Sequence, residues 1–192
     1  MEPDFARRLP NLETCVAQEM EEPGGPALCR VRLPAKCPNV HFAGKEYFCR
    51  YPERAAFVQR FNRKRELLRS VLCVDDEADI RQVVKHALER FGKVQAHLCD
   101  DSRGAAAMAR AVRPDLVLLD LVMPHMDGRA VFDQLKADPA LAGIPVVFFT
   151  AFVTPSNTEE LLRRGAAGVI AKPFDVQEFV NRMIEIWCER TP

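Results

Sequence analysis

The stretch DLVLLDLVMPHMDG, Asp115 to Gly128, decides the fold of this chain. Its apolar residues Leu116 to Leu119 do not alternate with polar ones, which is typical of a strand covered on both faces of a parallel sheet. The carboxylate of Asp120 follows directly, and Pro124 and Gly128 then provide the fixed and the permissive dihedral angles of a turn. We therefore expect Asp120 at the carboxyl end of a central strand, the edge of an open α/β sheet where ligands bind.

The composition limits the class of protein. The 192 residues are 48% hydrophobic and carry no formal net charge, so a core can form and nothing global indicates nucleic acid or an anionic membrane as a partner. No apolar run approaches the roughly 18 residues of a membrane span, and residues 1–10 lack the apolar core of a signal peptide. We expect a cytoplasmic protein without membrane insertion, whose seven cysteines are thiols or metal ligands rather than disulfides.

Apolar and amphipathic segments alternate after Ser70 and predict five repeats of strand and helix. The expected strands are 71–74, 94–98, 115–119, 145–149 and 168–171, and the expected helices are about 77–91, 102–112, 129–136, 157–164 and 176–188. This order predicts an α/β fold, a doubly wound five-stranded parallel sheet flanked by helices and joined by right-handed crossovers.

Polar residues at four of these strand ends are expected to meet at one edge of the sheet. They are Asp75 and Asp76, Asp120, Thr150, and Lys172 with Pro173. Crowded carboxylates repel one another unless a cation lies among them, and Mg²⁺ prefers oxygen ligands. The sequence thus predicts a metal-assisted phosphoryl acceptor, in which Asp120 attacks phosphorus while Lys172 and Thr150 donate hydrogen bonds to the phosphoryl oxygens.

Four segments, in this order, resemble the receiver domain of two-component response regulators. They are VLCVDDE (71–77), DLVLLDLVMPHMDG (115–128), VVFFTA (146–151) and AKPF (171–174). The resemblance covers residues 70–192 and implies a flavodoxin-like receiver fold. It also implies that a sensor histidine kinase or a phosphotransfer protein phosphorylates Asp120, and that the chain catalyses only its own phosphotransfer and slow dephosphorylation.

The resemblance further implies a role for each site residue. Asp76, Asp120 and the backbone carbonyl of Val122 would hold Mg²⁺ directly, and Asp75 would hold it through water. Pro173 would keep the bend that lets Lys172 reach the phosphoryl group, and in such domains the bond before this proline is often cis.

Two departures from the family pattern bear on signalling. Val169 stands where many receivers carry Tyr or Phe, so the phosphorylated state would be relayed by Thr150 and its loop or by Phe174. Val122 and Phe152 occupy the positions two residues after the phosphoacceptor and the threonine, and neither side chain can accept a hydrogen bond from an attacking water. We expect slow hydrolysis of the phosphorylated state.

The segment after the last expected helix is too short for an effector, so the expected output is contact with a downstream protein or with a second copy. Residues 189–192 alone follow that helix. The fourth and fifth elements are where such domains dimerise or dock partners. We expect Pro155 to stiffen the loop before the fourth helix and Ser156 to Glu159 to form its capping box.

The amino-terminal part matches no family that we recognise. We expect residues 1–51 to form a small irregular or helical module, 52–69 a basic connecting helix and 70–192 the receiver. Five metal-ligating side chains lie in the module: Cys15, Cys29, Cys37, Cys49 and His41. Their intervals are irregular and unlike ordinary zinc knuckles, so both thiols without metal and a site for Zn²⁺ or an iron-sulfur cluster stay open.

The connecting helix would carry an apolar face of Phe57, Phe61 and Leu68 on an otherwise basic surface. A solvated, packed helix is the favoured interpretation over one that contacts nucleic-acid phosphates, because basic runs are common on solvated helices. The alternative function is a metal- or redox-sensing transcriptional regulator whose amino-terminal cysteine module binds metal and nucleic acid.

Overall fold

The computed structural model describes residues 17–19, 27–30, 40–43, 46–49 and 54–190. The chain divides into two compact units, with boundaries between Leu67 and Leu68 and between Trp187 and Cys188. Within the described residues, no helix has the length and apolar character that a membrane crossing requires.

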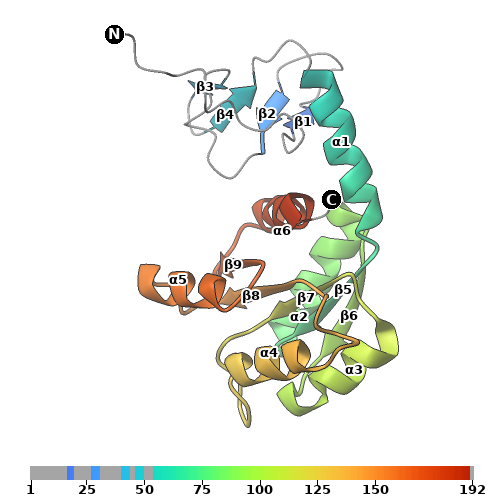
Figure 1. Ribbon diagram of the computed structural model, residues 1–192, viewed down its shortest axis with the longest axis vertical. Helices are drawn as coiled ribbons and strands as arrows, with labels where there is room; N and C mark the ends of the chain where they lie inside the picture. Colours follow the sequence, from blue (N-terminus) through green and yellow to red (C-terminus); the bar gives the residue numbers. More distant parts are fainter. Residues whose placement is uncertain (1–16, 20–26, 31–39, 44–45, 50–53, 191–192) are drawn as a thin grey trace. The chain divides into compact units, whose positions relative to one another are not determined.

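The larger unit, residues 68–187, is built on a parallel sheet (Figure 1). Its strands are β5 (Ser70–Val74), β6 (Gln95–Cys99), β7 (Leu116–Leu119), β8 (Val146–Thr150) and β9 (Gly168–Ala171). Their order is β6-β5-β7-β8-β9, and every neighbouring pair is parallel. The predicted doubly wound, five-stranded fold is confirmed, and β7, which precedes Asp120, is the central strand.

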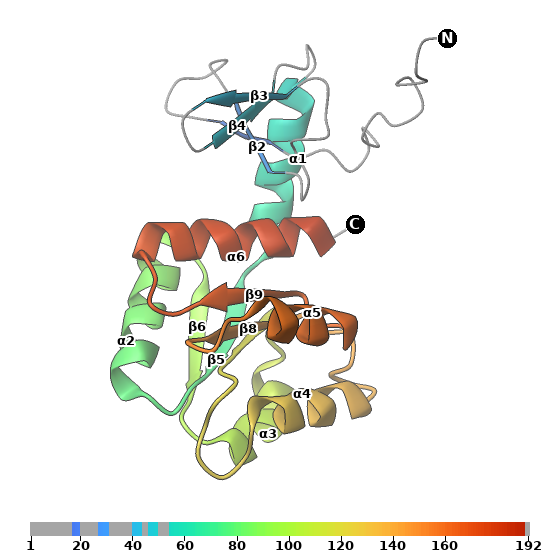
Figure 2. The same ribbon diagram turned by 90° about the vertical axis from the view of Figure 1, so that its left-hand side faces the viewer.

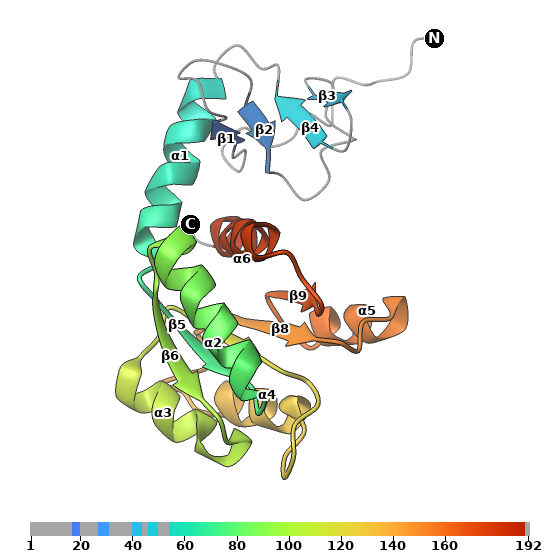
Figure 3. The ribbon, with the colours of Figure 1, turned by 180° about the vertical axis from the view of Figure 1, so that it is seen from behind.

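Helices alternate with these strands along the chain. They are α2 (Ala78–Ala87), the π-turn η3 (Leu88–Gly92), the 3₁₀ turn η4 (Ser102–Gly104), α3 (Ala105–Val112), α4 (Gly128–Ala137), α5 (Pro155–Arg163) and α6 (Val176–Arg190). Figures 2 and 3 show α3, α4 and α5 on one face of the sheet and α2 and α6 on the other. Every strand is thus followed by a helix that covers one of its faces, as a sheet buried on both sides requires.

Neighbouring apolar residues of a strand serve opposite faces of the sheet, which explains why the strand sequences do not alternate. The ring of Phe148 lies 5.6 Å from that of Phe132 on α4, whereas the ring of Phe149 lies 5.1 Å from that of Phe179 on α6. Both phenylalanines of β8 are fully buried. A continuous apolar run is therefore what this central position demands.

The smaller unit contains a four-stranded antiparallel sheet. Its strands are β1 (Ala17–Glu19), β2 (Ala27–Cys29), β3 (Val40–Ala43) and β4 (Glu46–Cys49), in the order β1-β2-β4-β3. Ala17 and Ala27 are buried with Phe57 and Val58 of helix α1 (Arg54–Leu67). The predicted irregular or helical module is therefore replaced by a sheet; strands of three or four residues are too short to show a periodic pattern in the sequence.

Helix α1 ends one residue before Leu68, so the predicted apolar stripe is wrong at its last member. Phe57 and Phe61 are buried on the helix, while Leu68 belongs to the larger unit. The backbone of the next residue is bonded to the parallel sheet: the amide of Arg69 donates to the carboxylate of Asp115, and its carbonyl accepts from the amide of Gln95. Pro52, where the helix was expected to begin, lies outside the described residues.

Candidate functional site

Asp75 follows β5 and is fully buried. Its amide continues the parallel ladder by donating to the carbonyl of Cys99, 3.1 Å away. One carboxylate oxygen accepts a hydrogen bond of 3.0 Å from the amide of Glu77. A buried carboxylate is costly unless it is paired, so its second oxygen needs a cationic partner. The neighbouring Asp76 is exposed at the same strand end.

Asp120 stands at the equivalent point of β7. Its amide donates to the carbonyl of Val74, and its Oδ1 accepts a hydrogen bond of 2.6 Å from the amide of Leu121. A Cβ on Gly128 would come 2.1 Å from the carbonyl oxygen of Asp120. Gly128 is therefore needed because the backbone of α4 comes close to the backbone of Asp120, and not for the permissive dihedral angle expected from the sequence. The residue of this loop with a left-handed backbone is His125, whose φ is 71°.

Lys172 joins the two buried carboxylates. Its ammonium donates to Asp75 Oδ2 at 2.7 Å and to Asp120 Oδ2 at 3.0 Å, and it lies 5.2 Å from the centre of the Phe149 ring. The Lys172–Pro173 peptide is cis, as expected. The side chain of the lysine is nearly buried, so the interaction is little screened by solvent.

The charges at this site shift each other's protonation. Burial raises the pKa of Asp75, and hydrogen bonds from Lys172 and from the amide of Glu77 only partly oppose it. Burial alone would lower the pKa of Lys172, but hydrogen bonds to Asp75 and Asp120 together outweigh it and raise that pKa. The lysine therefore remains a cation between the two carboxylates at neutral pH.

Thr150 ends β8 and is buried beside this edge of the sheet. It pairs in register with Ala171, and its carbonyl accepts a hydrogen bond from the amide of Lys172. Its Oγ1 accepts one of 3.1 Å from the amide of Phe152. The threonine hydroxyl is thus oriented by its own loop.

Three carboxylates at this edge are suited to a hard cation. One oxygen each from Asp75, Asp76 and Asp120 lies within 4.8 Å of the others, and no second group of three or more metal-ligating side chains occurs in the part of the chain that the structure describes. Carboxylate oxygens are the ligands that Mg²⁺ takes in proteins, so the residues fit this ion.

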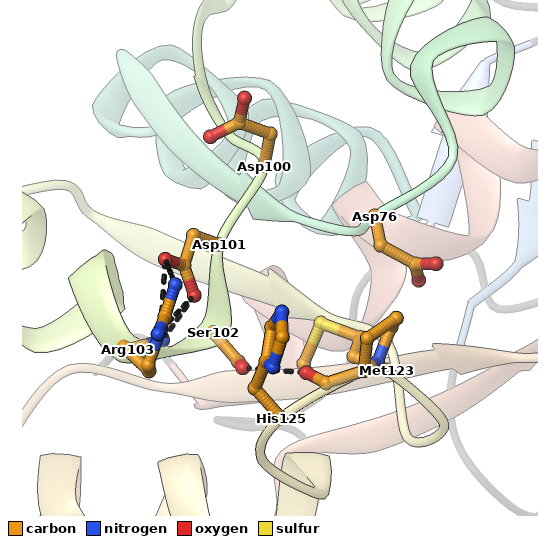
Figure 4. A pocket seen from close by; sticks show the side chains of 8 residues that line it. Asp76, Asp100, Asp101, Ser102, Arg103, Met123 and His125 are labelled. Atoms are coloured by element: carbon orange, nitrogen blue, oxygen red, sulfur yellow. Dashed lines mark hydrogen bonds and ion pairs between the residues drawn. The ribbon is translucent and has the colours of Figure 1, made fainter.

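A cavity of about 310 Å³ has Asp76 in its wall (Figure 4). The wall also includes Asp101, whose carboxylate is paired with Arg103, and His125. The hydrogen bond from Arg103 lowers the pKa of Asp101 to about 2. Ser102 is buried and donates to the carbonyl of Pro124, which ties the loop after β6 to the loop after β7.

The amino-terminal metal hypothesis receives no support. Cys15 and Cys37 lie outside the described residues. Cys29 is on β2, Cys49 on β4 and His41 on β3, and none of them belongs to a metal-ligating group among the described residues. Cys49 instead packs against the apolar core of its unit.

Several polar residues around the site were not singled out from the sequence. Glu77 reaches the ammonium of Lys172 at 3.5 Å, and Arg129 and Asn157 form a hydrogen bond across 28 positions of sequence. The position of Glu77, directly after the acidic pair, is a local signal that could have identified it. The pairing of Arg129 with Asn157 has no local signal, because only the fold brings α4 and α5 together.

Comparison with known proteins matches residues 71–184 to the response regulator receiver domain. The transcriptional regulator RpaA of Synechocystis is 34% identical over 113 residues, 59% of this chain and 46% of the relative. The phosphate regulon regulator PhoB of Pseudomonas aeruginosa is 35% identical over 115 residues, 60% of this chain and 50% of the relative. The chain thus spans about half the length of these relatives. The structure of Vibrio cholerae chemotaxis protein CheY4 superposes with a TM-score of 0.58 at 28% identity, covering 62% of this chain and 98% of the other.

Proposed function

Because the chain belongs to the response regulator receiver domain family, we propose that it is a phosphorylation-controlled response regulator in which Asp120 accepts a phosphoryl group from a histidine kinase or a phosphotransfer protein. One observation carries this assignment to particular residues: a single ammonium, that of Lys172, bonds both buried carboxylates at the carboxyl edge of the sheet. This pair lies at the carboxyl edge of an open α/β sheet, where ligands bind, which supports a functional role for both acids.

The proposed reaction is a transfer between histidine and aspartate. A carboxylate oxygen of Asp120 attacks the phosphorus atom of a phosphohistidine; the new O–P bond forms while the P–N bond breaks, and the imidazole nitrogen keeps that electron pair. Leu121 and Lys172 bond the two oxygens of the carboxylate, at 2.6 and 3.0 Å, which orients it before the reaction. Lys172 and the hydroxyl of Thr150 then donate to the phosphoryl oxygens.

Asp76, Asp120 and the backbone carbonyl of Val122 would hold Mg²⁺, with Asp75 acting through water. When bound, this ion offsets the negative charge of the carboxylates and of the incoming phosphoryl group. Pro173 supports the backbone that directs Lys172 into the site.

The output we propose is contact with a downstream protein or with a second copy of the chain, in the cytoplasm. The curated relatives are named as transcriptional regulators, but the match covers about half of their length, so DNA binding is not part of the proposal. Catalysis is limited to self-phosphotransfer and hydrolysis of the phosphorylated residue.

Mass spectrometry of protein treated with Mg²⁺ and a small acyl phosphate donor tests the proposal. We expect one base-labile phosphoryl group on the wild type and none on Asp120→Asn. Asp101→Asn is the matched control, because Asp101 is an acid of the adjoining cavity that is already paired with Arg103, and it should be labelled like the wild type. Labelling of Asp120→Asn at the wild-type level would show that another residue is the acceptor.

A further inference from the structure

The loop that follows Thr150 is held by two hydrogen bonds to Phe152. The amide of Phe152 donates to Thr150 Oγ1 at 3.1 Å, and its carbonyl accepts from Asn157 Nδ2 at 3.1 Å. Asn157 itself is fixed in the first turn of α5, where its amide donates to Oγ1 of the N-cap residue Thr154. The position of the threonine hydroxyl is thus linked to the start of α5 through one residue.

The other end of the Asn157 side chain bonds to α4. Its Oδ1 accepts a short hydrogen bond from the guanidinium of Arg129, which also contacts the carboxylate of Glu160 on α5 at 3.3 Å. Arg129 is half-buried, and Asp127, the N-cap of α4, lies 3.6 Å from it. Figure 2 shows α4 and α5 along the same face of the sheet.

The first turn of α4 has little freedom to move. The amide of Gly128 donates to the carbonyl of Leu121 at 2.9 Å, and the helix backbone there lies against the carbonyl of Asp120. Arg129 follows directly and is carried by this turn. A continuous series of hydrogen bonds and chain links therefore runs from the carbonyl of Leu121, the residue after Asp120, through Arg129, Asn157 and Phe152 to the hydroxyl of Thr150.

We propose that Arg129 and Asn157 form a latch that holds residues 151–154 in the resting arrangement and opposes the phosphorylated one. The inference rests on the proposed function and specifies its regulation. When the hydroxyl of Thr150 turns to a phosphoryl oxygen on Asp120, the amide of Phe152 loses its acceptor and the carbonyl of Phe152 leaves Asn157. Both events break hydrogen bonds of the resting state. The latch therefore lowers the affinity of the site for a phosphoryl group, and a bound phosphoryl group weakens the latch to the same extent.

Titration calorimetry of the full chain with Mg²⁺ and beryllium fluoride, a tetrahedral mimic of a phosphoryl group on a carboxylate, tests the latch. Asn157→Asp keeps an acceptor for Arg129 but removes the donor to Phe152, and Arg129→Gln weakens the contact from the other side. Each variant should bind beryllium fluoride about fivefold more tightly, the effect of one net hydrogen bond.

Arg164→Gln is the matched control. Arg164 also joins α5 to α4, through bonds of 2.6 and 2.7 Å to Asp133; it lies 3.7 Å from Glu160 as well, but it bonds neither Asn157 nor residues 151–154. Its loss should leave the affinity unchanged. If the wild type binds beryllium fluoride and Asn157→Asp binds it equally or more weakly, the latch is refuted while the proposed function stands. If the wild type does not bind it at all, the proposed function itself fails.

Discussion

The loops that follow Asp120 and Thr150 begin alike and are held differently. In each, a buried side chain at the end of a central strand accepts a hydrogen bond from a nearby backbone amide. The first loop is then fixed by backbone packing, with Gly128 against the carbonyl of Asp120. The second, residues 151–154, is exposed along its whole length and is held by side chains. Asp120, the proposed acceptor, is thus attached to a rigid loop, while Thr150, which we propose binds the phosphoryl group, is attached to a loop held only by side-chain hydrogen bonds.

Gly128→Ala tests the backbone packing of the first loop most directly. Its Cβ would lie 2.1 Å from a backbone oxygen that cannot move without displacing Asp120, so we expect a loss of about 4 kcal/mol in the free energy of unfolding. Urea denaturation measures this. Gly143→Ala is the control, because nothing lies within 4 Å of a Cβ there, and it should be close to neutral. Equal stability of the two variants would show that the first loop is not rigid.

Lys172 bonds the residues from which both loops start, Asp120 through its ammonium and the carbonyl of Thr150 through its amide, and removal of its side chain sharpens the comparison. Lys172→Met leaves two buried carboxylates without their cation, and we expect it to cost about 3 kcal/mol at neutral pH without metal. Because the folded-state pKa of Asp75 is raised, its protonated form favours folding, and stability is lost as the pH rises through that pKa. Without the lysine this pKa should rise further, so the difference from the wild type should narrow as the pH falls into the acid range.

Thermal unfolding at a series of pH values checks this dependence. Ser102→Ala is the control, because the buried hydroxyl of Ser102 donates to the carbonyl of Pro124, which does not titrate. Its loss should therefore cost the same at each acid pH. A constant difference for Lys172→Met as well would mean that the carboxylates do not depend on it.

One exposed residue from each loop, Val122 and Phe152, should set the lifetime of the phosphorylated state. Val122 and Phe152 are 65% and 63% exposed, so both side chains lie where water reaches the loops, and neither can accept a hydrogen bond from it. The double variant Val122→Asn, Phe152→Glu should lose its phosphoryl group at least about tenfold faster in Mg²⁺ buffer. Val153→Glu adds the same charge one residue further along and should decay like the wild type. Equal or slower decay of the double variant would mean that water access is controlled elsewhere.

The smallest expected effect concerns the end of the second loop. Thr154, not Ser156, caps α5: its Oγ1 accepts from the amide of Asn157 at 3.2 Å, and Pro155 occupies the first turn. Thr154→Ala should lower the free energy of unfolding by about 1 kcal/mol, and Ser156→Ala should leave it nearly unchanged. Urea denaturation of both variants measures the difference, and the reverse order would restore the capping box expected from the sequence.

The site residues that could be predicted from the sequence stand directly after unbroken apolar runs, which are easy to recognise locally. Unbroken apolar runs mark β7 and β8 as buried on both faces, and a polar residue at the end of such a run stands out, as Asp120 and Thr150 do. A parallel sheet then brings these ends to one edge, so the members of the site, though not their roles, could be inferred together. The strand positions and the fold followed from the same pattern.

The features that were missed depend on contacts distant in sequence. The strands of the smaller unit are three or four residues long, and β2 pairs with β1 and β4 across longer segments, so the sheet shows no local periodic pattern. Gly128 looked like a turn residue because its true constraint, the carbonyl of Asp120, is eight positions away. Leu68 continued the spacing of α1 although the backbone after it is bonded to the parallel sheet. At Gly128 and Leu68, tertiary contacts decide the structure where the local sequence pattern suggested otherwise.

The ammonium of Lys172 has a consequence for selection among cations. It lies within 3.0 Å of an oxygen of both Asp75 and Asp120, so these acids already have an internal counter-ion. A metal ion that binds Asp75 and Asp120 must compete with the ammonium of Lys172. This ammonium is covalently part of the chain, so its local concentration does not depend on the solution. We therefore expect a lower affinity for a cation than three carboxylates alone would provide.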